Sequence, residues 1–176
     1  ATFSIQQFYP KNLIKYKFSD LYEMGSGIST SKEQAGHGYP FASFSTVINN
    51  YFLPDTLTDL MDATEEQREV SSILEGDILI TRTSETPDEL AMSCVALKDY
   101  PNATFSGFVK RLRPKNKDLV YPKYMAFYLR GPYFRKLVNS NTVMTLRASF
   151  NEHIFKFMNI YLPSYDTQKQ IGDLLY

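Results

Sequence analysis

The sequence predicts an α+β fold in which a β-rich N-terminal part precedes a smaller α/β C-terminal part. Residues 77–81, 92–97 and 104–112 are rich in β-forming residues and are predicted strands. After Pro114 the large apolar residues recur mostly at helical spacing. Strands that come first and helices that follow them are typical of an α+β arrangement.

The N-terminal elements are expected to be short. Residues 13–17 alternate weakly between polar and apolar residues, and residues 18–24 predict a short helix that ends at the glycines of residues 25–27. Residues 30–38 are polar and punctuated by glycine, which predicts a loop.

Two further segments lie before the central strands. Residues 39–47 carry spaced aromatic and apolar residues and predict a strand, whereas residues 53–69 form an acidic connection with one helical turn at most. Residues 99–102 contain proline and asparagine and predict the turn between the last two central strands.

The C-terminal part reads as helices interrupted by one strand. Pro122 stands where a helix tolerates proline best, at its first position, and residues 133–138 predict a second helix. Residues 149–152 match a capping box and start a third helix. Residues 158–162 alternate as in a half-buried strand, and a last helix begins near Ser164.

Composition limits the classes of protein to consider. A chain of 176 residues with 43% apolar and 15% aromatic residues can fold around a core as one domain. The single cysteine, Cys94, excludes an internal disulfide and a cysteine-based zinc site, and its apolar surroundings predict burial. No apolar run approaches the roughly 18 residues of a membrane helix, and no secretory signal opens the sequence. We therefore expect a cytoplasmic protein that does not enter a membrane.

Charge is distributed unevenly although the net charge is zero. Residues 1–102 hold 7 Lys and Arg against 15 Asp and Glu, and residues 103–176 hold 12 against 4. The acids concentrate in residues 55–69 and the cations in residues 110–117. This uneven distribution favours a charged interface, and a polyanion is one partner that such an interface could bind. The alternative is that two solvated faces differ in charge by chance.

Motifs for catalysis are missing from the sequence. There is no P-loop, no Asn-Pro-Pro-Tyr segment for a flipped adenine and no Glu-x-Lys element for a nuclease metal site. His37 and His153, the two histidines, are far apart in sequence and have no partners at ligand spacing. Because no nucleophile, base and orienting group can be assembled, we expect a binding module without catalytic residues, metal or cofactor.

Three stretches of the sequence carry a family resemblance through their order and spacing. They are Gly76-Asp77 followed by the apolar residues 78–80, the block 105–114 with the aromatic residues of 124–134 behind it, and residues 160–164 with Gln168 and Ile171 beyond them. Together they resemble one target recognition domain of a type I restriction-modification specificity subunit. Thr167-Gln168 stands where the family commonly has Glu-Gln.

The resemblance implies a fold, a function and partners. The family fold combines a β-helix-like or barrel-like half with an α/β half, so residues 1–163 would form the recognition domain and residues 164–176 the start of a spacer helix. The implied function is recognition of one half of a bipartite site in double-stranded DNA. Modification subunits that methylate adenine and a restriction subunit would be the partners, and a half-length subunit would form a homodimer.

Candidate DNA contacts divide into two sets because phosphate contacts position a protein whereas base contacts specify the sequence. On an extended strand Lys110 and Arg111 point to opposite faces, so only part of the basic run can meet one DNA backbone. The phosphate candidates are Lys110, Arg111, Arg113, Lys115 and Lys117. The base candidates, which offer paired or hydroxyl hydrogen-bonding groups, are Thr81, Arg82, Thr83, Ser84, Glu85, Arg147 and Asn151.

Each arginine among the base candidates has a structural alternative. Arg82 is nearly as well placed in sequence for an ion pair with Glu85 or Asp88, and Arg147 for capping a neighbouring carbonyl. The alternative for the whole chain is a protein-interaction module whose basic face docks an acidic partner or the acidic residues 55–69 of a second copy. A steep loss of affinity with salt would favour DNA, and a change of oligomeric state would favour self-association.

Overall fold

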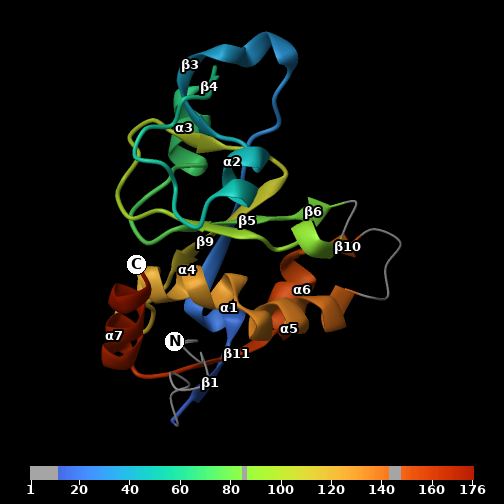
Figure 1. The fold of residues 1–176 in the computed structure, drawn as a ribbon. Coiled ribbons are helices and arrows are strands. Elements are labelled where there is room, and N and C mark those ends of the chain that lie inside the picture. Colours follow the sequence, from blue (N-terminus) through green and yellow to red (C-terminus); the bar gives the residue numbers. More distant parts are fainter. Residues whose placement is uncertain (1–11, 85–86, 143–147) are drawn as a thin grey trace, which may run out of the picture.

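The computed structural model describes residues 12–84, 87–142 and 148–176. A four-stranded sheet crosses the middle of the molecule in Figure 1, with a smaller sheet and two short helices above it and most of the helices below it. The mixed α and β content agrees with the predicted fold class. The elements nevertheless alternate along the chain more than the sequence indicated.

The central sheet is antiparallel throughout and has the strand order β2-β9-β5-β7. Its register aligns Leu112 of β9 with Met24 on one side and with Ile78 on the other. The strands are β2 (Tyr22–Ser26), β9 (Val109–Pro114), β5 (Ile78–Thr81) and β7 (Ser93–Val95).

A three-stranded sheet, β4-β3-β8, forms the upper end of the molecule. Its strands are β4 (Leu60–Met61), β3 (Ala35–Ala42) and β8 (Thr104–Phe105), and the helical segments beside it are η2 (Lys32–Gln34), α2 (Phe44–Asn49) and α3 (Glu65–Val70). The predicted strand 39–47 is therefore wrong beyond Ala42. Ser43 ends it because its hydroxyl accepts a hydrogen bond from the Thr46 N–H at 3.1 Å and caps α2.

The lower part holds most of the helices and two small antiparallel pairs, β1–β11 and β6–β10. The strands are β1 (Ile14–Lys17), β11 (Asn159–Leu162), β6 (Thr83–Ser84) and β10 (Ala148–Ser149), and the helical segments are α1 (Phe18–Leu21), η3 (Pro87–Glu89), α4 (Pro122–Arg130), α5 (Pro132–Thr142), α6 (Glu152–Phe157) and α7 (Tyr165–Leu175). The helix predicted to begin at Pro122 and the last helix near Ser164 are confirmed.

The expected barrel-like half is not confirmed. In the described residues no sheet closes on itself, and beyond β7 the central sheet continues only as a single bridge from Val95 to Phe52. Strands β2 and β7, at the two ends of the sheet order, are five and three residues long. The β-rich part is instead built from open sheets packed together.

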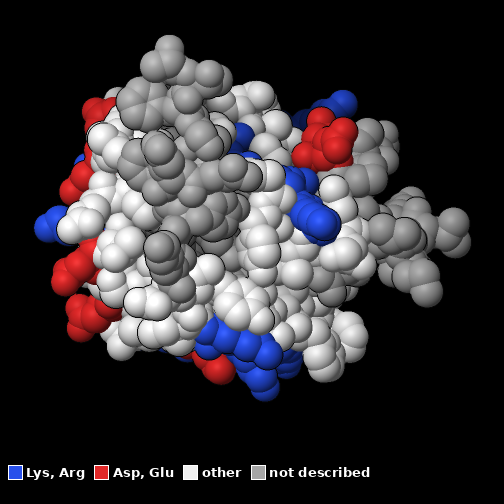
Figure 2. Space-filling view, turned by 60° about the horizontal axis from the view of Figure 1, so that its bottom comes forward, with Lys and Arg blue, Asp and Glu red and all other residues white. Residues whose placement is uncertain are grey.

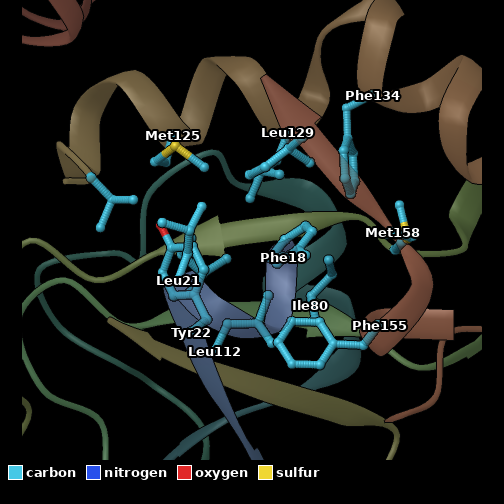
Figure 3. Close-up of a cluster of buried hydrophobic side chains, with 14 of the residues drawn as sticks. Phe18, Leu21, Tyr22, Ile80, Leu112, Met125, Leu129, Phe134, Phe155 and Met158 are labelled. Carbon is cyan, nitrogen blue, oxygen red and sulfur yellow. The ribbon is translucent and has the colours of Figure 1, made fainter. Parts of the chain in front are cut away.

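Two apolar clusters lie on opposite faces of the central sheet. Ile78, Ile80 and Leu112 point into the larger one, whereas Leu79 and Val109 point into the other, as the alternation of a strand requires. In the larger cluster Phe18 lies under α4 and beside α6, surrounded by labelled apolar side chains (Figure 3). Cys94 is fully buried in the second cluster, which confirms its predicted structural role.

Helix α7 is held against the rest of the chain by a buried glutamine. The Gln168 amide donates to the carbonyls of Leu119 and Pro163 at 2.8 and 3.0 Å, and its oxygen accepts from the Tyr121 N–H at 2.9 Å. Beside it, a side chain on Gly172 would come within 2.7 Å of the Tyr124 backbone nitrogen. Helix α7 is therefore fixed against the start of α4 and the residues just before it.

Candidate nucleic-acid interface

Arg82 lies where three segments of the chain meet. Its backbone N–H donates to the carbonyl of Phe108 at 2.9 Å, and its own carbonyl accepts from the Phe150 N–H at 2.7 Å. Its guanidinium is exposed and donates to the Gly107 carbonyl at 3.3 Å. The end of β5, the turn before β9 and the start of α6 therefore support one exposed arginine.

Lys110 lies on the same edge of the molecule. It is half-buried, and its ammonium donates to the Ser26 hydroxyl at 2.9 Å. Burial lowers the pKa of Lys110, the nearby Arg82 charge lowers it further, and Glu152 opposes both effects. Two cations that repel each other at one edge favour an anionic ligand, because such a ligand would relieve the repulsion. We call Arg82, Lys110 and their supporting turn 106–108 the cationic edge.

The basic run is divided between the faces of the sheet, as strand alternation predicted. Arg111 and Arg113 point away from Lys110 and make structural contacts. The Arg111 guanidinium donates to the carbonyls of Val70 and Ser72 at 3.0 and 2.8 Å. The contacts of Arg111 and Arg113 hold α3 and the following loop to β9, so both candidate phosphate contacts already have partners within the chain.

Arg113 is engaged by a buried carboxylate. Its Nε donates to Asp77 Oδ1 at 2.9 Å and its Nη2 to Oδ2 at 2.7 Å, while Oδ2 also accepts from the Leu74 N–H. The Asp77 side chain is fully buried, and its hydrogen bond raises the pKa of Arg113. No local sequence signal predicted this ion pair, because Asp77 and Arg113 lie 36 residues apart.

Lys115 and Lys117 remain exposed after β9. The backbone of Lys115 is held in place because its N–H donates to the Leu21 carbonyl at 2.9 Å. Five residues of extended chain separate Lys115 from Lys110, a span of roughly 15 Å. The basic residues, lysine and arginine together, form several separate groups in the view of Figure 2, and uncharged surface lies between these groups.

Thr81 is a base candidate whose side chain lies inside the protein. It is fully buried at the end of β5, where its hydroxyl donates to the Glu89 carbonyl and accepts from the Met92 N–H. A hydroxyl with both functions satisfied inside the protein offers nothing to a base. Its role is to hold Glu89 and Met92 against the end of β5.

The other base candidates fall near Arg82 or outside the described residues. Thr83 is half-buried and pairs with Ser149, and the backbone of Ser84 pairs with Ala148, in the β6–β10 ladder. Asn151 is exposed next to this ladder. Glu85 and Arg147 lie outside the described residues.

Asn151 also caps a helix. Its side-chain oxygen accepts from the Ile154 N–H at 3.0 Å, so Asn151 and not Ser149 is the N-cap of α6. The predicted capping box began two residues too early because Ser149 belongs to β10. The Asn151 amide N–H groups are donors that the cap does not use.

Two helix arginines were missed because no acid or motif marked them in sequence. Arg130 donates to the carbonyls of Ser93, Val47, Ile48 and Asn50 at 2.7–2.9 Å and joins α4 to the end of α2. Arg135 donates to the carbonyls of Leu90, Ala91 and Asp88 at 2.7–3.3 Å. Burial lowers the pKa of both guanidinium groups.

Arg135 thereby joins α5 to η3 and to the two residues that follow it. The exposed ring of Phe108 next to Arg82 was also missed, since residues 104–112 were predicted as one unbroken strand. Gly107 is the sequence signal that marks the break.

In the described part of the chain, no group of three or more His, Cys, Asp or Glu side chains is arranged to hold a metal ion. The same residues include no helix with the length and apolar character needed to span a membrane.

The fold and the cationic edge define a mixed α/β module that presents an arginine and a lysine on a strand-supported edge. Residues 10–176 match the family described as type I restriction modification DNA specificity domain. The chain belongs to this family. No curated protein matches the sequence.

Solved structures show the same fold. A chain from a study of complex assembly and conformational transition of the type I R-M system is 17% identical, with a TM-score of 0.66 over 95% of this chain. The HsdS subunit from Thermoanaerobacter tengcongensis is 18% identical, with a TM-score of 0.62 over 95%. The type I S subunit from M. genitalium is 13% identical, with a TM-score of 0.61 over 97%. This chain spans 38%, 37% and 39% of those chains.

Proposed function

We propose that this chain recognises one half of a bipartite site in double-stranded DNA and performs no catalysis itself. Arg82, Thr83 and Asn151 would contact bases, with Ser84, Glu85 and Arg147 from the same sequence segments as further candidates. Lys110, Lys115 and Lys117 would contact phosphates. Modification and restriction subunits would act on the DNA that the chain selects.

We place the interface at this edge because of the position of Arg82. Hydrogen bonds to Phe108 and Phe150 hold its backbone, while its guanidinium stays exposed near Lys110. A guanidinium on a fixed backbone can hold the two acceptors of guanine in the major groove. Membership of a DNA specificity family supports the function, and this geometry supports the site.

We further propose that residues 164–176 begin a spacer helix, leaving residues 1–163 as the recognition domain. Gln168 and Gly172 support this division because they fix the first turns of α7 against α4. The orientation of the recognition domain would then follow the direction of the helix. In a half-length subunit, two copies would form a homodimer and supply both half-sites.

Arg82→Ala is expected to reduce discrimination between the target and a duplex with one changed base pair by about 1–3 kcal/mol. The guanidinium would no longer satisfy paired acceptors on one base, while the phosphate contacts would remain. The target is first found by mapping methylated sites in cells that express the subunit with its methyltransferase partners. Binding of the assembled methyltransferase to both duplexes then gives the discrimination. Unchanged discrimination would reject Arg82 as a base contact.

Lys117→Ala is expected to weaken binding to all duplexes equally and to reduce the salt slope of log affinity by about 1. The reason is that a phosphate contact releases counterions without reading sequence. Titrations of target and unrelated DNA at several salt concentrations measure this slope. Lys98→Ala is the matched control, because Lys98 pairs with Asp55 at 2.7 Å in the acidic half of the chain. An equal change in both variants would assign the effect to net charge.

The alternative, a module that docks an acidic partner or the acidic residues 55–69 of a second copy, makes a different prediction. Arg111 and Arg113 already contact their own chain, which reduces the basic surface available to an acidic protein. Light scattering at low and high salt without DNA would detect self-association. Salt-dependent dimers that do not bind DNA would favour this alternative.

A further inference from the structure

The aromatic ring of Phe108 lies on the surface of the cationic edge. Phe108 is 64% exposed, while Phe105 in the same connection is fully buried. A single exposed apolar side chain is common on protein surfaces and does not indicate a function by itself. The support of its backbone and the charge of its neighbours distinguish Phe108.

The turn that carries Phe108 is fixed from both sides. The Phe108 N–H donates to the Ser106 hydroxyl at 3.2 Å, and its carbonyl accepts from the Arg82 N–H at 2.9 Å. The Gly107 N–H donates to the Ile28 carbonyl at 2.9 Å, and a side chain on Gly107 would lie 3.1 Å from that oxygen. The ring is thus presented on a backbone that loses little entropy when a partner binds.

Two cations lie close to the backbone that carries the ring. The Arg82 guanidinium donates to the carbonyl of Gly107, the residue before Phe108. Lys110 follows two residues later and is held by Ser26 at 2.9 Å. An apolar ring accompanied by positive charges matches duplex DNA, in which stacked bases lie between phosphate backbones. Proteins that bind the minor groove insert apolar side chains between base pairs and kink the duplex, and Phe108 would wedge in the same way from the groove that Arg82 reads.

We propose that Phe108 is an apolar wedge that contacts a base-pair step, while Arg82 and Lys110 bind the bases and phosphates beside it. This inference rests on the proposed DNA-binding function and deepens it. It adds a sequence preference that needs no hydrogen bond to a base, because flexible pyrimidine–purine steps open at the lowest cost. The target would therefore contain such a step at the position that Phe108 contacts.

Phe108→Ala in the complete subunit, assembled with its methyltransferase partners, tests the proposal. Affinity for the target duplex is expected to fall on the order of tenfold. The bend, measured by energy transfer between dyes at the two ends of the duplex, is expected to decrease. Phe108→Leu is expected to retain most of both, because leucine also serves as a wedge. Phe157→Ala is the matched control, since Phe157 is 70% exposed at the end of α6.

The outcomes separate the wedge from the proposed function. If Phe108→Ala binds and bends DNA as the original does while Arg82→Ala loses base discrimination, the wedge is wrong and the DNA interface stands. If neither variant changes DNA binding, the cationic edge is not the interface. Both the proposed base contact of Arg82 and the proposed wedge of Phe108 are then wrong. The wedge would also be wrong if Phe157→Ala lost as much DNA affinity as Phe108→Ala. The same holds if Phe108→Ala impaired assembly with the methyltransferase partners and the assembled complex kept its DNA affinity.

Discussion

Phe18→Ala is expected to lower the free energy of unfolding by about 4 kcal/mol, the largest effect of the substitutions considered. Phe18 is fully buried, and its ring centroid lies 5.2–6.3 Å from those of Tyr22, Phe134, Phe150 and Phe155. These rings come from β2, α5, the segment before α6 and α6 itself. A cavity here would remove contacts from all four segments together (Figure 3). Urea unfolding monitored by circular dichroism measures the loss.

Phe18→Leu is the control for the size of the cavity. Leucine retains apolar volume at the site, so the loss is expected to be less than half of that for alanine. Comparable losses in both variants would indicate that the aromatic contacts, and not the volume, determine stability. A loss below 1 kcal/mol for Phe18→Ala would contradict the central place of this ring in the core.

Asp77→Ala is expected to lower the free energy of unfolding by about 3 kcal/mol. Removing the carboxylate takes away two hydrogen bonds to Arg113 and one to the Leu74 N–H. The Arg113 guanidinium would then remain charged without its buried partner. Its 30% side-chain exposure gives it some access to water, so we expect a value at the lower end for a broken buried pair. Thermal and urea unfolding both measure this loss.

Asp77→Asn separates charge from shape. The amide oxygen still accepts the Leu74 N–H, whereas the ion pair is lost, so the expected destabilisation lies between those of the original and Asp77→Ala. Arg113→Met removes the other partner. If Arg113→Met weakened DNA binding and left stability unchanged, the structural role that we assign to Arg113 would be wrong.

Much of the fold followed from local sequence signals. The Gly76-Asp77 turn, the strand after it and the proline that opens α4 are encoded by residues close to one another. Phe44 and Val47 show why other elements were not predicted. Their spacing of three residues fits one face of a helix, and this helix begins where the Ser43 hydroxyl accepts the Thr46 N–H, whereas the aromatic and apolar composition favoured a strand. The pairing of distant strands, which leaves the sheets open, has no local signal.

The candidate site was predictable in composition but not in arrangement. Strand alternation correctly divided Lys110 from Arg111, and the exposure of Arg82 agrees with its selection as a candidate. Burial of Thr81 could not be foreseen, because its hydroxyl is satisfied by a segment that returns eight to eleven residues later. The partner of Arg113 lies 36 residues away, so its engagement depends on the tertiary fold.

The two-sided burial of β5 and β9 restricts how relatives of this chain can diversify their targets. Inserting one residue into β9 would turn Arg111 toward the larger apolar cluster in place of Leu112 and bury a cation, so length changes inside these strands would be eliminated by selection. The turn 106–108 and the segment after Thr81 lie at the strand ends and carry no such penalty. New specificities are therefore expected to evolve by exchange of these short tips, while the strands that carry them keep their length.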